Sequence, residues 1–235
     1  MNETTTEATE AIGSSNTLST EVVKRIRHAI LCGELPPGSK LRLEALRQKL
    51  GITQSRGPLR EALSRLGSEG LVLIEDQRGY RVAPISEDNL QEIAKLRVHL
   101  ETLALREAIS KGSETWIHNV QVALENLSLV KRWDGMPVEE LTKWELAHHS
   151  FHFTLLSACG MPQLLSYCES LHDQNDRYRR IFLAKNPFDR DVKGEHKLIL
   201  DATIERNADL ACVLLAQHIE RTTKNIAKAI ADQKI

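Results

Sequence analysis

The chain has 235 residues, of which 41% are hydrophobic, and its 31 Lys and Arg nearly balance its 32 Asp and Glu. This length is enough for two domains of ordinary size, each with its own core. No stretch approaches the roughly 20 consecutive apolar residues of a membrane-spanning helix, and the start of the chain lacks the pattern of a signal peptide. We therefore expect a cytoplasmic protein without membrane contact.

The charges are unevenly distributed along the chain. Residues 20–83 contain twelve Lys and Arg against seven Asp and Glu, a net charge of +5, whereas residues 84–235 have a net charge of −3. Residues 1–19 are rich in Thr, Ser and Glu and have no periodic apolar pattern, so they are predicted to be a disordered tail. Because a local basic surface displaces counterions from phosphate, residues 20–83 are candidates for contact with nucleic acid.

The basic segment has the pattern of a small helical domain. Apolar residues at helical spacing predict a first helix that ends at Gly33, and Pro36-Pro37-Gly38 predicts a turn. A second short helix ends at Gly51, where glycine suits the backbone of a helix C-cap. Two short strands, residues 71–75 and 80–83, are predicted further on, joined through a turn that contains Gly79.

A third predicted helix precedes the strands and begins with cations. Pro58 can open this helix, because its missing N–H would be unsatisfied in the first turn in any case. The buried side is formed by Leu59, Ala62, Leu63 and Leu66. Arg56 and Arg60 are left at the exposed N-terminal end, where a recognition helix contacts base edges and Arg pairs with guanine. The alternative is that both are solvated charges on an ordinary surface helix. Three helices followed by a hairpin predict a winged helix-turn-helix.

Four linked motifs lie within residues 22–85. They are Gly33-x-x-Pro36-Pro37-Gly38-x-x-Leu41, Ser55-Arg56-x-Pro58-Leu59-Arg60-Glu61-Ala62-Leu63, Glu69-Gly70-Leu71-Val72 and Arg78-Gly79-Tyr80-x-Val82. Together they resemble the GntR family of bacterial transcription regulators. The resemblance implies that Ser55, Arg56 and Arg60 contact operator DNA and that Gly79 lies at the tip of the wing.

The chain departs from that family at two places. The residues between Gly51 and Pro58 are more numerous than the family usually has, and Ala45 follows Glu44 where a polar or basic residue often stands. We therefore predict no DNA contact at Ala45.

Pro84-Ile85-Ser86 marks a predicted domain boundary, with residues 84–87 as a linker and 88–235 as an all-helical domain. Ser86 can cap a helix whose first turn carries Glu87 and Asp88. Helices are predicted over residues 87–110, 114–132, 138–159, 162–184, 188–206 and 208–232. The fold class is thus mostly α, an N-terminal winged helix-turn-helix followed by an all-α bundle.

Four histidines stand on the apolar sides of three of these helices. His148 and His152 are four residues apart and project from one helix face, while His196 and His218 belong to the last two helices. Neutral imidazoles that converge in a bundle are good ligands for zinc, nickel, copper or iron. The alternative is that each is a buried helix residue hydrogen-bonded to a neighbour. His149 is turned away from the pair, and the remaining histidines, His28, His99, His118 and His172, show no such arrangement.

Residues 87–230 also resemble the FCD domain of helical GntR members of the FadR group. That domain has an Asp-x-x-x-His pair on one helix and two later histidines, matched here by His152, His196 and His218. His148 stands where the family has aspartate. A neutral nitrogen in place of an anionic oxygen favours zinc, with nickel as the alternative, over manganese. It is equally consistent with the pattern that His148 does not ligate.

A predicted effector pocket involves cations on buried helix faces. Arg97 falls in or beside an apolar stripe, where an Arg needs an anion, although an intrahelical pair with Glu101 would also provide one. In the resembling domains an arginine of the first helix pairs with a carboxylate effector, which matches Arg97. Arg179 and Asn175, which lie in line on another helix, are further candidates for effector binding.

The sequence therefore predicts a transcription regulator, with double-stranded operator DNA, a small carboxylate effector and a second copy of the chain as partners. A divalent transition metal is the predicted cofactor. Two alternatives stay open: a metal-dependent enzyme on a histidine-lined bundle, and a regulator that senses metal directly. A metal-dependent hydrolase would need a nearby carboxylate as general base, but no glutamate lies between His148 and His152.

The four cysteines are far apart in the sequence and are predicted to be reduced thiols.

Overall fold

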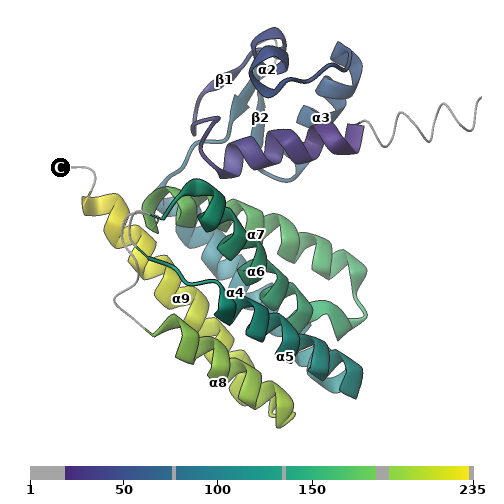
Figure 1. Ribbon diagram of the computed structural model, residues 1–235, viewed down its shortest axis with the longest axis vertical. Helices are drawn as coiled ribbons and strands as arrows, with labels where there is room; N and C mark the ends of the chain where they lie inside the picture. The colour runs from purple at the N-terminus through teal and green to yellow at the C-terminus, as the bar shows by residue number, and fades with distance from the viewer. Residues whose placement is uncertain (1–18, 76–77, 134–135, 184–190, 233–235) are drawn as a thin grey trace, which may run out of the picture. The chain divides into compact units, whose positions relative to one another are not determined.

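The computed structural model describes residues 19–75, 78–133, 136–183 and 191–232. Residues 1–18 of the predicted disordered tail lie outside these ranges, as do residues 134–135 and 185–187, which fall between predicted helices. The chain divides into two compact units, residues 1–85 and 86–235. Each unit has its own core, and the ribbon in Figure 1 shows a small mixed unit and a larger helical one.

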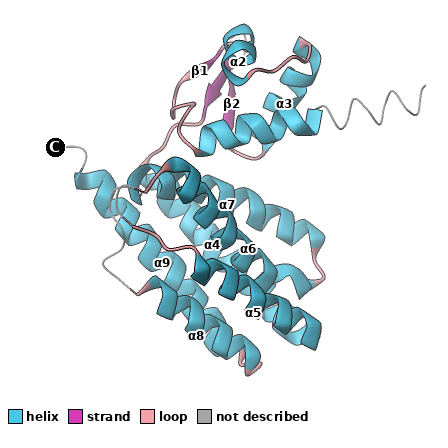
Figure 2. Cartoon of the chain, viewed as in Figure 1, coloured by secondary structure: helices cyan, strands magenta, loops and turns pink. Residues whose placement is uncertain are grey.

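The first unit combines three helices with a small sheet. A helix over residues 19–31 is followed by β1 (Lys40–Leu41), α2 (Leu43–Leu50), α3 (Arg56–Ser68), β2 (Val72–Glu75) and β3 (Gly79–Val82). The strands form an antiparallel sheet in the order β1-β3-β2, drawn in magenta in Figure 2. The predicted hairpin is therefore present, but β1 was not predicted, because two residues are too few to show a strand's alternation.

The core of this unit follows the predicted apolar spacing. Ile26 of the first helix, Leu46 of α2 and Leu63 of α3 are all buried, with exposed fractions of at most 3%. Gly51 ends α2 in the left-handed region at a φ of 59°, and its N–H bonds to the carbonyl oxygen of Gln48. That turn leads directly into the connection before α3.

Helix α3 begins at Arg56 rather than at Pro58. Pro58 therefore occupies the third helical position, which it can do because the first N–H groups of a helix have no partner within the helix. As a result the connection after Gly51 is only residues 52–55. Two of the extra residues seen between Gly51 and Pro58 in the sequence belong to the helix itself.

The second unit is all helical, so the predicted fold class is confirmed. It consists of α4 (Glu87–Lys111), α5 (Glu114–Leu129), α6 (Val138–Leu156), a 3-10 turn (Ser157–Cys159), α7 (Pro162–Leu183), α8 (Val192–Ile204) and α9 (Ala208–Asp232). The Ser86 hydroxyl caps α4 by accepting from the Asn89 N–H at 3.1 Å, as predicted. Helix α4 packs against α7 and α9. Among the described residues, none of the helices combines the length and the apolar character needed to cross a membrane.

Candidate DNA-contacting surface and metal centre

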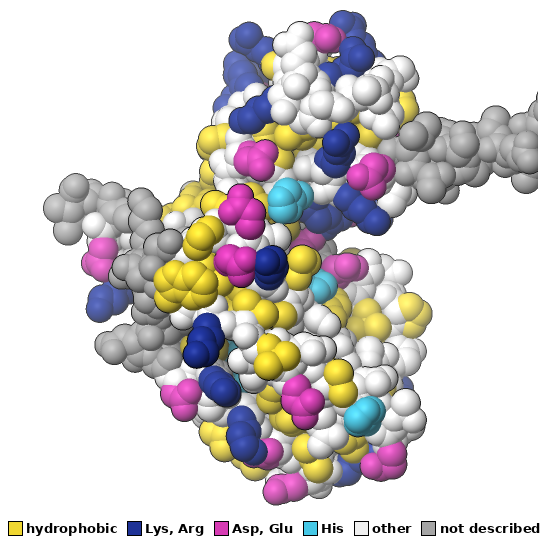
Figure 3. All heavy atoms as spheres, in the orientation of Figure 1, with side chains coloured by type: hydrophobic (Ala, Val, Ile, Leu, Met, Phe, Trp, Pro, Cys, Tyr) yellow, Lys and Arg dark blue, Asp and Glu magenta, His cyan; other side chains and the backbone are white. Residues whose placement is uncertain are grey.

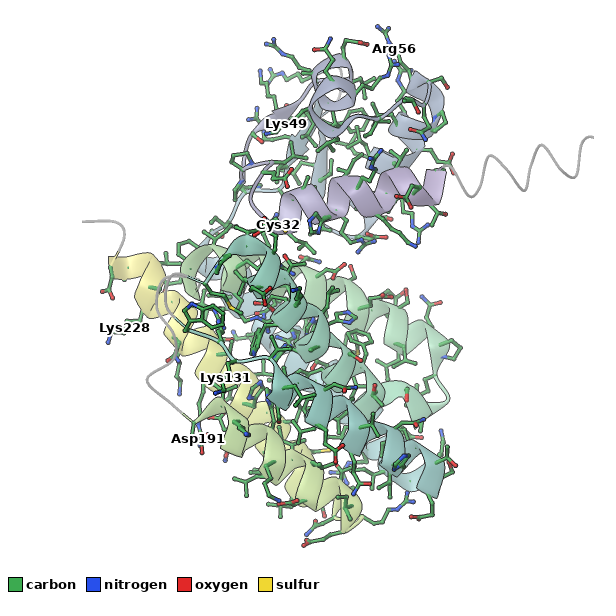
Figure 4. The ribbon with its side chains drawn as sticks, viewed as in Figure 1. Cys32, Lys49, Arg56, Lys131, Asp191 and Lys228 are labelled. Carbon is green, nitrogen blue, oxygen red and sulfur yellow. The ribbon has the colours of Figure 1, made fainter. Side chains whose placement is uncertain are left out.

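The N-terminal end of α3 carries the predicted DNA contacts. The Arg56 side chain is 69% exposed, and Arg60 and Ser55 are exposed as well. In Figure 4 the Arg56 side chain extends outward from the first unit, and its guanidinium lies 3.9 Å from a Glu44 carboxylate oxygen. Ser55 is the N-cap of α3 but makes no side-chain capping bond, so its hydroxyl is not used by the helix end. Dark blue Lys and Arg spheres recur over the end of this unit that carries α2 (Figure 3).

Gly79 starts β3 at the far side of the hairpin. It has a φ of +92°, and nothing lies within 4 Å of the position a Cβ would take. Only backbone strain, and not crowding, therefore opposes a side chain here. The strand after it is held by Arg81, whose Nε donates to Glu75 Oε1 at 2.9 Å across the hairpin.

Three helices of the second unit bring four histidines together. His148 and His152 come from α6, His196 from α8 and His218 from α9, and each is at most 4% exposed. One ligand nitrogen from each lies within 4.8 Å of those of the others. The Nε2 atoms of His148 and His152 are 3.2 Å apart. The predicted convergence of these side chains is thus present, with His148 inside the group.

The environment of the cluster favours uncharged imidazoles. Burial, and then the positive charge of Arg179, lower the pKa of His148 well below its ordinary value. Burial also lowers the pKa of His152, helped by the neighbouring His218 and His196. A neutral imidazole has a lone pair for a metal ion, so His148 and His152 can bind a divalent transition metal at neutral pH without first losing protons.

Two neighbours orient the cluster from outside. Glu195 Oε2 lies 2.8 Å from His218 Nδ1, and Glu195 Oε1 accepts from Arg221 Nη1 at 3.0 Å. A carboxylate on one ring nitrogen fixes the tautomer and leaves Nε2 of His218 for a ligand role, as in many metal sites. On α6, the Trp144 ring stacks on His148 with centroids 4.8 Å apart.

Arg97 and Arg179 are both buried, and both have carboxylate partners. Arg97 Nε donates to Glu101 Oε1 at 2.6 Å, the intrahelical pair that the sequence offered as the alternative to a pocket role. Arg179 of α7 bonds to Glu145 of α6 and, at 2.5 Å, to Asp176 Oδ1. Each guanidinium is therefore neutralised within the bundle.

Asn175 lies one turn before Arg179 on α7 and is 1% exposed. Its Nδ2 has no hydrogen-bond partner among the described residues. Of the predicted effector-binding side chains, it is the one whose donor is unused.

A cavity of about 430 Å³ adjoins the cluster. Its wall includes His196 and Trp144, the apolar side chains of Leu124, Leu127, Val130 and Val192, and the cations Lys131, Arg132 and Lys193. Lys131 and Asp191, labelled in Figure 4, mark the parts of the wall that follow α5 and precede α8. The composition of this wall suits a small anion with an apolar part.

Known proteins resemble this chain in both units. Residues 18–82 match the bacterial regulatory proteins of the gntR family, and residues 92–221 match the FCD domain. The uncharacterized HTH-type transcriptional regulator BphR of Paraburkholderia xenovorans is 35% identical over 210 residues, which cover 89% of this chain and 85% of BphR. The HTH-type transcriptional repressor GlaR of Escherichia coli is 34% identical over 212 residues, covering 88% of this chain and 94% of GlaR. The solved structure of E. coli McbR/YncC shares the fold, with a TM-score of 0.72 at 22% identity over 92% of this chain and 98% of that one.

These matches decide the family. The chain belongs to the GntR family and has an FCD domain. It is therefore a DNA-binding transcription regulator, as predicted, and the enzyme alternative is excluded because its relatives and both families are regulators. In this GntR protein the four histidines all lie within the residues that match the FCD domain.

Several side chains at the centre of this GntR protein were not predicted. Glu145 and Asp176 hold Arg179, Trp144 covers His148, and His172 lies beside the cluster although no role was predicted for it. One signal could have found part of this set: His172, Asn175, Asp176 and Arg179 follow the spacing i, i+3, i+4, i+7 and share one face of α7.

Proposed function

We propose that this regulator binds operator DNA under the control of a small carboxylate effector, which binds next to a divalent metal ion held by the histidine cluster. The observation that carries the proposal is the convergence of four buried histidines in a domain fused to a winged helix-turn-helix. We also propose a cytoplasmic location, which a function in DNA binding supports. The proposed metal is zinc, with nickel as the alternative, because all the available ligands are nitrogens.

Electrostatics support an anionic effector. Four imidazole ligands add no negative charge to a divalent ion, and the nearby carboxylates of Glu101, Glu145 and Glu195 are each paired with an arginine. A buried charge needs a partner, and a carboxylate that enters from the cavity beside His196 provides one. Asn175 supplies an unused donor. We propose that Arg97 and Arg179 bind the effector only if they release the carboxylates that they now contact.

A regulator that senses the metal itself is the second candidate. It is favoured by the number of histidines, since four nitrogen ligands complete the tetrahedral coordination of zinc without an effector. Chelation followed by metal titration separates the two functions. A metal that only restores effector binding supports the effector-controlled regulator, whereas a metal that changes operator affinity by itself supports the metal sensor.

We further propose that the protein acts as a homodimer on two half-sites. Half-sites about one helical turn apart make operator affinity sensitive to the placement of the two winged helices. A physical route from the pocket to the linker is available in α7. The Tyr178 hydroxyl, next to Arg179, accepts from Ser86 N at 3.0 Å and contacts Asn89 Oδ1 at 2.9 Å, at the very start of α4.

Tyr178→Phe tests that route. We expect the variant to bind effector and operator separately as the parent does, but the effector-dependent change in operator affinity should shrink severalfold, because one helix no longer holds the start of the other. The measurement is operator affinity with and without a proven effector. Tyr167→Phe, on an exposed tyrosine of the same helix, is the matched control. Unchanged coupling in Tyr178→Phe would remove this route from the mechanism.

Arg56→Ala and Arg60→Ala test the recognition helix. Each change should weaken binding to the operator by about 1–3 kcal/mol if the side chain reads a base. The measurement is a salt-titrated binding assay on DNA from the protein's own promoter region, with unrelated DNA for comparison. Arg106→Ala, at a half-exposed cation of α4, serves as a control for the loss of charge. Parental affinity in both arginine variants would show that α3 does not read the DNA.

A further inference from the structure

His172 is a buried residue of α7 that lies beside the histidine cluster without belonging to it. It is 1% exposed, and its ring centroid is 6.0 Å from that of His148 and 5.8 Å from that of His152. The rest of its surroundings include Phe153 and His149, both in edge-on ring contacts. The ring thus faces the space around the proposed metal from the α7 side.

The hydrogen-bonding groups of His172 are unused. Neither ring nitrogen has a hydrogen-bond partner among the described residues. The Oδ1 atom of Asp176 lies 3.4 Å from Nδ1 of His172 but does not form a hydrogen bond with it. One turn on, Asn175 Nδ2 also lacks a partner among the described residues. Buried polar groups in native proteins nearly always have partners, so two neighbouring exceptions indicate a missing ligand.

The spacing assigns His172 to the second coordination sphere. The four clustered histidines place their ligand nitrogens within 4.8 Å of one another, and His172 is not part of that group. At this distance the His172 ring is poorly placed to coordinate an ion that the four clustered histidines already bind. It can, however, reach an atom of a further ligand bound to that ion. A hydrogen bond from this second sphere can orient an exogenous ligand of the ion without contacting the ion itself.

We propose that His172, together with Asn175, hydrogen-bonds to the carboxylate that binds at the metal and so determines which acids the pocket accepts. A neutral imidazole offers one donor and one acceptor, and the Asn amide offers further donors. That set suits an oxygen-rich acid, whose carboxylate accepts from the donors. The inference rests on the proposed metal-dependent function.

Cobalt-loaded full-length protein provides the test, with acetate as the probe carboxylate. Cobalt replaces zinc in nitrogen sites, and its visible absorption responds to a new oxygen ligand. His172→Phe keeps the aromatic volume but has no hydrogen-bonding atoms, His172→Gln restores a donor, and His118→Ala is a control at an exposed histidine. The readouts are cobalt per chain, the midpoint of thermal unfolding, and the acetate affinity.

We expect all variants to bind cobalt as the parent does. Acetate affinity should fall by about tenfold in His172→Phe, the size of one hydrogen bond to a charged group, and recover in part in His172→Gln. Unchanged acetate affinity in His172→Phe, or loss of cobalt from that variant, would overturn the proposed contact of His172 with the carboxylate. Neither result would contradict a metal site in the parent protein. A parent protein that takes up no cobalt would overturn the proposed metal function and this inference together.

Discussion

The His196→Ala/His218→Ala double variant is expected to contain no bound transition metal, whereas the parent protein should carry about one ion per chain. These two residues supply the contributions of α8 and α9 to the cluster, so their loss leaves only the adjacent pair on α6. Two imidazoles cannot hold zinc with the affinity of a complete site. Elemental analysis of protein purified without added metal measures the result.

Metal binding should also appear in the stability of the parent. An ion that binds only the folded state raises the free energy of unfolding, by about 2.7 kcal/mol at a free concentration one hundred times the dissociation constant. Chelation should therefore lower the unfolding midpoint of the parent and leave the double variant unchanged. His118→Ala, at an exposed histidine, should behave as the parent in both assays. A full complement of metal in the double variant would mean that the clustered histidines are core residues.

A change at His148 distinguishes a metal site with three histidine ligands from one with four. The FCD resemblance places an aspartate there, and the structure places the side chain inside the cluster, stacked on Trp144. Within the same elemental analysis, His148→Ala with retained metal indicates that the other three histidines suffice. Loss of metal from it assigns His148 as a ligand.

The sequence predicted most of the fold because its patterns are local. Leu59, Ala62, Leu63 and Leu66 define the buried side of α3 by spacing alone, and all four are fully buried. His148 and His152 could be paired for the same reason, since both lie on one turn of one helix. The apolar helix faces that carry His196 and His218 made their convergence on that pair possible, and the resemblance to the FCD domain supported it, because no local pattern relates three separate helices.

The partners of the buried arginines could be predicted only in part. The pair of Arg97 with Glu101 was predicted as the alternative to an effector contact, because Glu101 is four residues away on the same helix. Glu145, in contrast, meets Arg179 across the contact between α6 and α7, from 34 residues away in the chain. Such a pair depends on how the two helices are rotated and packed against each other. Hydrophobic periodicity does not predict that packing, so the contacts of Glu145 and His172 could not be predicted.

Arg179→Met is expected to destabilise the protein by about 3–5 kcal/mol near pH 8, because it leaves two buried carboxylates without their cation. Arg179 is 3% exposed, and Glu145 and Asp176 are at most 5% exposed. Burial alone would lower the pKa of Arg179, but these two carboxylates hold it above its ordinary value. Urea unfolding of parent and variant measures the difference. Arg106→Met, which breaks an exposed pair with Asp209, should have little effect.

The pH dependence of that loss follows from Asp176. Burial raises the pKa of its carboxyl to about 7 even though Arg179 opposes the shift, and removal of Arg179 must raise it further. A folded-state pKa above the unfolded value means that the folded protein holds the proton more tightly, so stability falls as pH rises between the two values. The deficit of Arg179→Met should therefore be largest near pH 8 and shrink toward pH 5.5, where Asp176 is protonated in both folded proteins. A deficit that stays constant over this range would show that the ionised Asp176 carboxylate, left without its cation, is not its cause.

The same variant decides between the two roles of Arg179. At pH 5.5, where the variant should be best folded, an effector that binds it as well as the parent would leave Arg179 with the structural role alone. Weakened effector binding in a protein whose stability has recovered would mean that the guanidinium exchanges Glu145 or Asp176 for the effector carboxylate. Such an exchange would alter the contact of α7 with α6, and Tyr178 on the same helix holds the first turn of α4. Effector binding would then alter the position of α7, which holds the first turn of α4 next to the linker. A change of operator affinity on effector binding requires coupling of this kind.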